Sequence, residues 1–333
     1  MNFDPRILQG SRTYQIGIEN YGREDVIDQI SNHCIVCEPY TAGRFLIVTE
    51  KYVICTTRFI IATEDIELFY IDEGLRVSQV TVYDRYGNIF CECVAMAKGS
   101  APKIMAAVQR LVPTAAFDLK PQTQLDYKRR HREDLERNAR AMMNNKPFRV
   151  FNAASLYPDD AIPIIITFAV FTGLALLRVF DGSKGSIGAK LTCVIIFGAL
   201  TVLLFIVRAR TTVAFKTTVK DIEGEVLDQL NNRMIYAPER KTRKGVYVTD
   251  RYIILSGEGI VNREDVVGIS AHIYKGTIHV DIADKFGNKY EGKITASSKL
   301  DYWREEQYIG SVLPNAVTGR SSENDEYIQG FHL

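Results

Sequence analysis

The strongest constraint on the fold is an internal repeat, in which residues match those found 200 positions further along the chain. The stretch 26–32 (VIDQISN) matches 226–232 (VLDQLNN), and both place apolar residues at helical spacing. Three further pairs share the offset: 48–54 with 248–254 (VTEKYVI, VTDRYII), 64–66 with 264–266 (EDI, EDV), and 83–88 with 283–288 (YDRYGN, ADKFGN). A repeat of this length predicts two copies of one fold, each large enough to bury its own core.

Both copies are expected to hold the same elements in the same order. A short amphipathic helix begins each copy, runs rich in β-branched and aromatic residues follow, and a second helix ends it at 101–111 or 300–313. Strands are predicted at 45–49, 52–56, 59–62, 66–71, 77–83 and 89–94, and at 246–249, 252–255, 259–262, 266–270, 277–282 and 289–294. Helix, antiparallel strands and closing helix together define the α+β class.

Two apolar runs separate the copies. Residues 161–177 and 191–207 contain no charged side chain, and each would cover about 25 Å as a helix, close to the lower bound for a hydrocarbon core of about 30 Å. The turn-rich segment 181–188 between them suits a short re-entry loop. The pattern predicts a transmembrane helical hairpin over 161–207, and a hydrophobic hairpin buried in protein is the alternative.

The flanking charges predict the orientation of this hairpin. Residues 128–149 carry eight Lys or Arg and 208–220 carry four, whereas the connecting segment 178–190 carries three. An excess of cations outside the hairpin favours a protein of the bacterial inner membrane with two spans and both termini in the cytoplasm. The amino-terminal residues also lack the apolar run of a secretory signal.

The expected organisation therefore has five parts. They are a first domain at 1–120, a basic juxtamembrane linker at 121–160, the hairpin at 161–207, a second domain at 208–316 and a flexible tail at 317–333.

The repeated motifs resemble a known family. The patterns V-T-[DE]-[KR]-Y-[IV]-I, E-D-[IV] and D-[KR]-[FY]-G-N, set in short antiparallel strands before a helix, are similar to bacterial pleckstrin-homology-like (PH-like) domains of uncharacterised membrane proteins. The resemblance covers 24–115 and 224–316. It implies two small antiparallel β-barrels, each capped by a helix, that bind partners instead of catalysing a reaction. No catalytic residue is implied, because the motifs are structural.

Cysteines are the weak candidates for a metal site. Cys34 and Cys37 have the CxxC spacing that suits zinc, and Cys91 and Cys93 would share one face of a strand. The second copy replaces Cys91 and Cys93 with a glutamate and a lysine, and free cysteine is common in cores. Structural thiols are therefore favoured over a metal or redox site, and we expect no cofactor.

A compact basic run is the candidate binding site. Arg240, Lys241, Arg243 and Lys244 precede the first long strand of the second copy. In a PH-like barrel this loop borders the open end, where cationic side chains can hold an anionic lipid headgroup or a partner. A solvated loop is the alternative interpretation.

Composition and motifs narrow the function classes. A net charge of +1 excludes a general nucleic-acid binder, and the five histidines form no metal-binding spacing. The sequence lacks a nucleophile elbow and an HExxH motif, so no enzyme is predicted. The leading hypothesis is a non-enzymatic, membrane-anchored binding or scaffold protein. Its partners would be the bilayer and a protein or a second copy. The alternative is a regulatory or sensor subunit of a membrane transporter or assembly.

Overall fold

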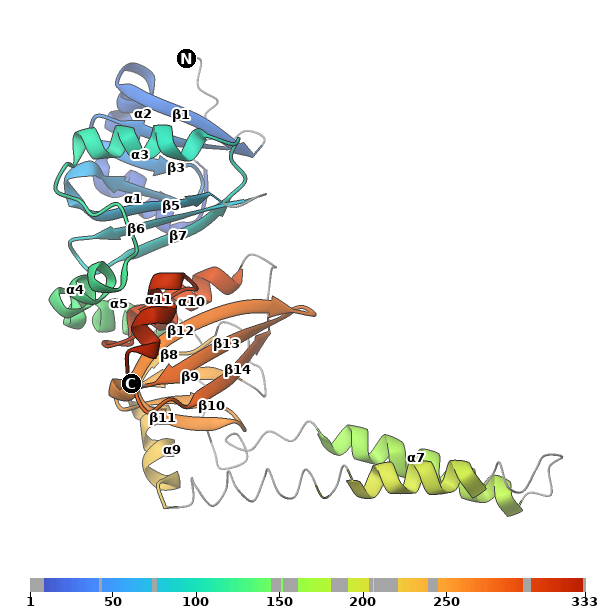
Figure 1. Cartoon of the computed structure of the whole chain (residues 1–333). Coiled ribbons are helices and arrows are strands. Elements are labelled where there is room, and N and C mark those ends of the chain that lie inside the picture. The colour runs from blue at the N-terminus through green and yellow to red at the C-terminus, as the bar shows by residue number, and fades with distance from the viewer. Residues whose placement is uncertain are drawn as a thin grey trace.

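The computed structural model describes residues 9–41, 44–73, 77–144, 151, 161–180, 191–203, 206, 221–238, 245–295 and 301–331. These residues form an α+β protein in which two similar repeats are stacked, with helices between them (Figure 1).

The first repeat contains two antiparallel sheets. Helices α1 (Arg12–Tyr21) and α2 (Arg23–Asn32) come first. The first sheet contains β1 (Cys34–Thr41), β2 (Arg44–Thr49), β3 (Tyr52–Cys55) and β4 (Phe59–Ala62) in that order. The second sheet contains β5 (Ile66–Glu73), β6 (Ser78–Asp84) and β7 (Ile89–Val94), and α3 (Ser100–Leu111) closes the repeat.

The second repeat has the counterparts of α2, of the seven strands and of α3 at the expected offset, and no counterpart of α1 is found among its described residues. Helix α9 (Glu223–Asn232) precedes a sheet of β8 (Met234–Tyr236), β9 (Val246–Thr249), β10 (Tyr252–Leu255) and β11 (Gly259–Asn262). Strands β12 (Val266–Tyr274), β13 (Thr277–Asp284) and β14 (Lys289–Thr295) form the other sheet, which β15 (Val317–Thr318) extends in parallel beside β12. The closing helix is α10 (Asp301–Ser311).

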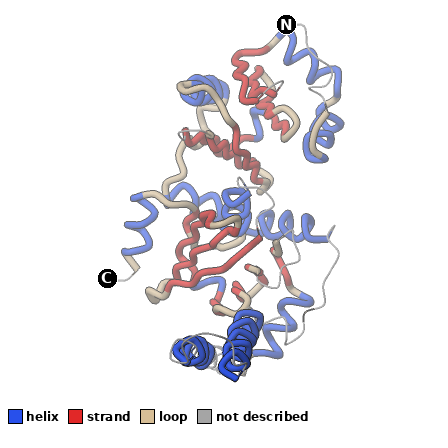
Figure 2. The backbone as a smooth tube through the Cα atoms, turned by 90° about the vertical axis from the view of Figure 1, so that its right-hand side faces the viewer, coloured by secondary structure: helices blue, strands red, loops and turns tan. Residues whose placement is uncertain are grey.

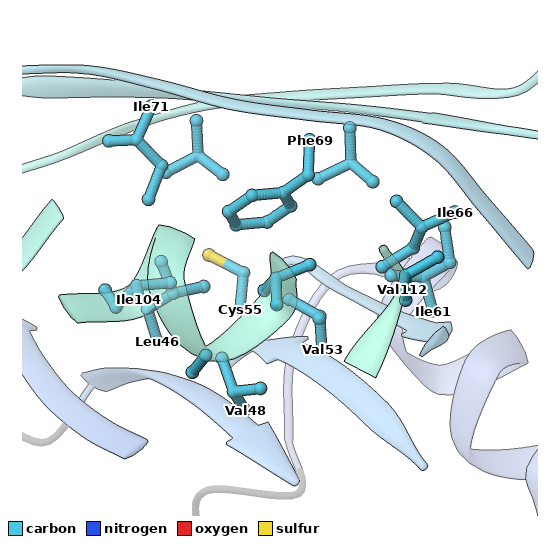
Figure 3. Close-up of a cluster of buried hydrophobic side chains, with 14 of the residues drawn as sticks. Leu46, Val48, Val53, Cys55, Ile61, Ile66, Phe69, Ile71, Ile104 and Val112 are labelled. Atoms are coloured by element: carbon cyan, nitrogen blue, oxygen red, sulfur yellow. The ribbon is translucent and has the colours of Figure 1, made fainter. Parts of the chain in front are cut away.

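Each repeat buries an apolar core between its two sheets and its closing helix. In the first repeat, Figure 3 shows Leu46 and Val53 of one sheet, Phe69 of the other and Ile104 of α3 pointing toward one another. All four side chains are almost completely buried. Burying one such apolar side chain stabilises the fold by about 2 kcal/mol. The strands that supply these side chains therefore carry apolar patterns, which makes them predictable from the sequence.

Several helices lie outside the repeated cores, and three of them flank the repeats directly. The first two, α4 (Pro121–Arg130) and α5 (Arg132–Asn144), follow the first repeat, and α11 (Ser322–Gln329) follows the second. The predicted linker 121–160 thus contains α4 and α5. The stretch predicted as a flexible tail, 317–333, contains β15 and α11, which Ser321 caps at its first turn.

The prediction of closed β-barrels is wrong. Among the residues that the structure describes, each repeat has two separate antiparallel sheets and no sheet closes on itself. A short 3-10 turn, Thr63–Asp65 or Arg263–Asp265, separates the sheets and interrupts the ladder of backbone hydrogen bonds between them.

The prediction of a two-span transmembrane hairpin over 161–207 is also wrong. Within the described ranges, no helix combines the length and the apolar character needed to cross a bilayer. Residues 191–203 are helical as well. The predicted inner-membrane location with two cytoplasmic termini depended on this hairpin, so that prediction is not supported either.

The apolar stretches instead form two helices that lie side by side in both views (Figures 1 and 2). Helix α7 (Ala161–Phe180) contacts the helical residues 191–203 through Phe171 and Phe197, whose ring centroids are 5.9 Å apart. The hydroxyls of Thr172, the residue after Phe171, and Thr201 meet at 3.5 Å.

Candidate functional site at the junction of the repeats

The motifs shared by the two repeats hold turns and strands in place. In the first repeat the Asp84 carboxylate accepts hydrogen bonds from the backbone N–H groups of Tyr86 and Asn88, at 2.9 and 2.8 Å, and from the Asn88 side chain at 2.8 Å. Asp284 makes the same three contacts in the second repeat, each at 2.9 Å. The D-x-x-G-N motif is therefore a self-capped hairpin turn.

The other shared motifs have equally structural roles. The Gln29 side chain accepts a hydrogen bond from the Lys51 backbone N–H at 3.2 Å, which ties α2 to the turn before β3. Gln229 and Arg251 repeat this contact at 3.2 Å. The aspartate of each E-D-[IV] motif forms an ion pair 2.7 Å long with the cation of the hairpin turn. The shared polar groups are therefore used to hold turns, strands and helices in place.

The candidate cysteines do not come together. Cys34 and Cys37 lie on β1 of the first sheet, whereas Cys91 and Cys93 lie on β7 of the second. Burial raises the pKa of Cys37 to about 11 and raises the pKa of Cys91 well above its usual value, so both thiols stay protonated at neutral pH. In the described part of the chain, no group of three His, Cys, Asp or Glu residues has metal-binding geometry. The basic run Arg240, Lys241, Arg243 and Lys244 lies outside the described residues.

The most elaborate polar site is the junction between the repeats, where α4 contacts both of them. On one side, the Tyr127 hydroxyl donates to the backbone carbonyl of Asp84 at 2.6 Å. On the other, the Lys128 ammonium donates to the carbonyl of Ala316 at 2.5 Å and to the Thr318 hydroxyl at 3.2 Å. Lys128 is only 2% exposed, and this burial lowers its pKa to about 7.

Helix α4 also forms hydrogen bonds with the edge strand β15 of the second repeat. The Thr318 backbone N–H donates to the Gln124 side-chain oxygen at 2.8 Å, and the Gln124 amide donates to the Thr318 carbonyl at 3.3 Å. The glutamine amide thus forms hydrogen bonds with the backbone N–H and C=O groups of edge strand β15, as a neighbouring strand would.

Helix α5 binds the second repeat through ion pairs. Arg263 is buried, and its guanidinium donates to the Val312 carbonyl at 2.9 Å and pairs with Glu136 of α5. Arg140 of α5 pairs with Asp250 of the second repeat in the same way. A buried guanidinium with a carboxylate partner fixes orientation more strongly than a surface pair does.

The end of α4, the residue that joins it to α5, and the middle of α5 contact the first repeat. Glu67 on β5 pairs with Arg130 at 2.8 Å and contacts His131 at 3.1 Å. Asn138 of α5 donates to the Tyr86 carbonyl in the hairpin turn at 3.0 Å. The α4–α5 pair is therefore a clamp with contacts on both repeats.

The closing helix of the second repeat completes the junction. The Tyr83 hydroxyl of β6 donates to the Gln307 side chain of α10 at 3.1 Å, and both residues are buried. Glu306, one position earlier, accepts a hydrogen bond from the Ala271 backbone N–H. Burial raises the pKa of Glu306 to about 8, and the bond from Ala271 opposes that rise.

Sequence reasoning misses this junction. It treats residues 121–160 as a basic juxtamembrane linker, whereas several cations of this stretch form ion pairs with carboxylates of the two repeats. Two junction residues differ between the repeats, because Thr63 and Tyr83 of the first repeat are replaced by Arg263 and Ala283 in the second. Many other aligned positions differ as well, so these replacements do not single out the junction.

The fold and the junction together define a duplicated α+β protein whose repeats are joined by a helical clamp. No protein-family model matches the chain, and no curated protein matches it.

Proposed function

We propose that the chain is a non-enzymatic binding or scaffold protein, whose two PH-like repeats bind a protein partner or an anionic lipid headgroup. The observation that carries the proposal is the buried polar junction. Tyr83 and Lys128 use buried hydrogen bonds, and Arg263 uses an ion pair with Glu136, to hold one repeat against its neighbours. Such contacts orient two binding surfaces relative to each other, which is what a scaffold requires.

The role of the shared motifs also supports binding. Asp84 and Asp284 are engaged by their own turns, and Gln29 and Gln229 by the backbone beside them. Groups with these partners maintain a fold in duplicate. Binding would then involve surface residues that differ between the repeats.

The test combines two measurements on the full chain. Chemical cross-linking in cells, followed by mass spectrometry, is expected to recover one protein in constant ratio to the chain. Flotation with vesicles, either of neutral phosphatidylcholine alone or with added phosphatidylserine, tests the lipid arm separately. A matched variant, Glu136→Gln, weakens the clamp and should lower recovery of the partner.

Two results would contradict the proposal. One is the absence of binding in both arms. The other is a catalysed turnover that disappears when a described side chain is replaced without loss of folding.

A further inference from the structure

Phe151 is seated on the second repeat, although it belongs to neither copy of the repeat. Its ring packs into an apolar cluster and meets the ring of Tyr247 edge-on, with the ring centroids 5.0 Å apart. The residue is only 9% exposed. The buried residues that share this cluster, called the aromatic site below, are Val226, Leu230, Met234, Tyr247, Tyr252 and Ile254.

The backbone of Phe151 is bound as well as its ring. Its N–H group donates to the Asn231 side-chain oxygen at 2.8 Å, and the Asn231 amide donates to the Phe151 carbonyl at 3.1 Å. The N–H and C=O groups of one residue point to the same side when the chain is extended, as they do between paired strands. One asparagine thus binds one residue of an extended segment through both backbone groups. Backbone hydrogen bonds beside a site for a side chain are the two parts of peptide recognition.

The first repeat has the same aromatic site, but it is filled in another way. Tyr14 of α1 lies in it, and the ten-residue helix also contributes Ile18 to the cluster. Ser31 stands at the position of Asn231, and one hydroxyl cannot replace the paired donor and acceptor of an amide. Both repeats therefore accept an aromatic side chain from a segment outside the repeat, and the second adds an asparagine that binds the backbone. The equivalent residues of the first site are Val26, Ile30, Ile47, Tyr52 and Ile54.

We propose that the aromatic site and Asn231 bind an extended, phenylalanine-bearing segment of a partner protein, and that Phe151 is the internal ligand of this site. The inference rests on the proposed function, because it names the kind of partner that the second repeat binds. The described contacts of Phe151 involve its ring and its own backbone groups, so another chain with phenylalanine at this point meets the same donor, acceptor and apolar surface. An attached ligand competes with a free one at an effective concentration on the order of 1 mM, so Phe151 keeps weak ligands out.

The test measures how the full chain binds a fluorescein-labelled peptide with the sequence of residues 146–155 (KPFRVFNAAS), by fluorescence anisotropy. In the variant Phe151→Ala the internal ligand loses its ring. This variant should bind the peptide at least tenfold more tightly than the unmodified chain does, because the competitor is gone. A second peptide, with alanine in place of the phenylalanine at position 151, should bind at least tenfold more weakly than the first.

The asparagine is tested in the same variant. Adding Asn231→Ala to Phe151→Ala removes both backbone hydrogen bonds and should weaken peptide binding at least tenfold. Asn232→Ala is the matched control, because the Asn232 side chain is exposed and bonds to Asp228. Urea unfolding followed by the fluorescence of Trp303 shows whether each variant is folded. Titration of the unmodified chain with both peptides, up to about 1 mM, gives a readout that does not require the Phe151 variant to fold.

Saturable binding that requires both the phenylalanine and Asn231 supports the site. Three results overturn it: no saturable binding to folded Phe151→Ala, binding no tighter than that of the unmodified chain, or binding that survives either alanine substitution. Self-association of the unmodified chain that Phe151→Ala abolishes overturns the assignment to a partner protein, because the segment then comes from a second copy.

Cross-linking in cells judges the proposed function separately. A partner that is recovered equally with the unmodified chain and with Phe151→Ala removes this inference and leaves the proposed function standing. Recovery of no partner, together with no vesicle binding, removes the proposed function whatever the peptide does.

Discussion

Lys128 gives the sharpest prediction about the junction, because its amine is buried with oxygen partners and no carboxylate partner among its described hydrogen bonds. Its two acceptors are the Ala316 carbonyl and the Thr318 hydroxyl. Burial lowers its pKa from 10.5 to about 7. The unfolded chain therefore binds one more proton than the folded chain between about pH 7 and about pH 10.5.

The sign and size of the effect follow from this difference. The free energy of unfolding rises as the pH increases through the window, by about 1.4 kcal/mol per pH unit from Lys128 alone, and this contribution is constant below about pH 7. Across the whole window the change is about 5 kcal/mol. Glu306 acts in the opposite direction, since its pKa is raised from 4.5 to about 8 and its contribution is lost as the pH rises through that range. Above about pH 8 Glu306 therefore no longer opposes the rise from Lys128.

The perturbation is Lys128→Met, which keeps the length of the side chain and removes its charge. It also leaves the Ala316 carbonyl and the Thr318 hydroxyl without this donor, at a cost of about 1–3 kcal/mol. We expect the variant to be about 2 kcal/mol more stable than the unmodified chain near pH 7 and about 2 kcal/mol less stable near pH 10.5. Lys120→Met, at an exposed position at the start of the same helix, is the control.

The measurement is urea unfolding at a series of pH values, followed by fluorescence of Trp303. This tryptophan is the only one in the chain, and it lies buried on α10 beside the junction. The difference in unfolding free energy between the two proteins should change sign within the window. A difference that stays constant from about pH 7 to about pH 10 would refute the argument that Lys128 is buried and neutral.

Three other perturbations test separate parts of the molecule. Gly87→Ala should lower the free energy of unfolding, measured with urea, by at least about 1 kcal/mol more than Gly287→Ala does. Both glycines have positive φ, but a Cβ at Gly87 would also lie 2.6 Å from the Cβ of Asp134 in α5. An equal loss of stability in the two variants would show that α5 does not pack closely against the turn at Gly87. Glu306→Gln should raise the free energy of unfolding at pH 8 by about 4 kcal/mol and remove its fall between pH 4.5 and pH 8, because the amide is neutral and its oxygen still accepts from Ala271; a persisting fall would contradict this assignment. Replacing the basic run with serine should weaken flotation with anionic vesicles at least tenfold, at about 1 kcal/mol per charge, and leave neutral vesicles unaffected. Unchanged flotation would remove the headgroup part of the proposed function. The positions replaced are Arg240, Lys241, Arg243 and Lys244.

The elements of each repeat are predictable because local sequence determines them. The predicted strand 59–62 is found as β4, and the predicted strand 252–255 is found as β10. Alternating apolar residues fix which face of a strand is buried, and the glycine of each D-x-x-G-N turn fixes where a hairpin reverses. The α+β class follows from the order of these elements. It does not determine whether two sheets join, and the 3-10 turn at Thr63–Asp65 keeps them apart.

The junction could not be predicted, because it depends on residues far apart in the sequence. Arg263 and Glu136 are separated by 127 positions, and Tyr83 and Gln307 by 224. A basic helix such as α4 is normally exposed to solvent, and nothing local distinguishes a lysine that tertiary contacts bury. The apolar stretch 161–207 shows the same limit, because a mean hydropathy does not determine what surrounds a helix.

Two positions at which the repeats differ lie where the repeats are held together, and this asymmetry favours one arrangement of the duplicated units. Two identical repeats would present identical faces, and a contact between them would be free to recur without end. Ala283 stands in the second repeat where the first has Tyr83, so the hydroxyl that binds Gln307 exists on one face only. Arg263 takes the place of Thr63 and gives Glu136 a buried partner in one repeat only. Substitutions of this kind make one arrangement of the repeats more stable than the others, whereas both repeats keep the aspartate of the D-x-x-G-N motif because each hairpin turn needs its own carboxylate.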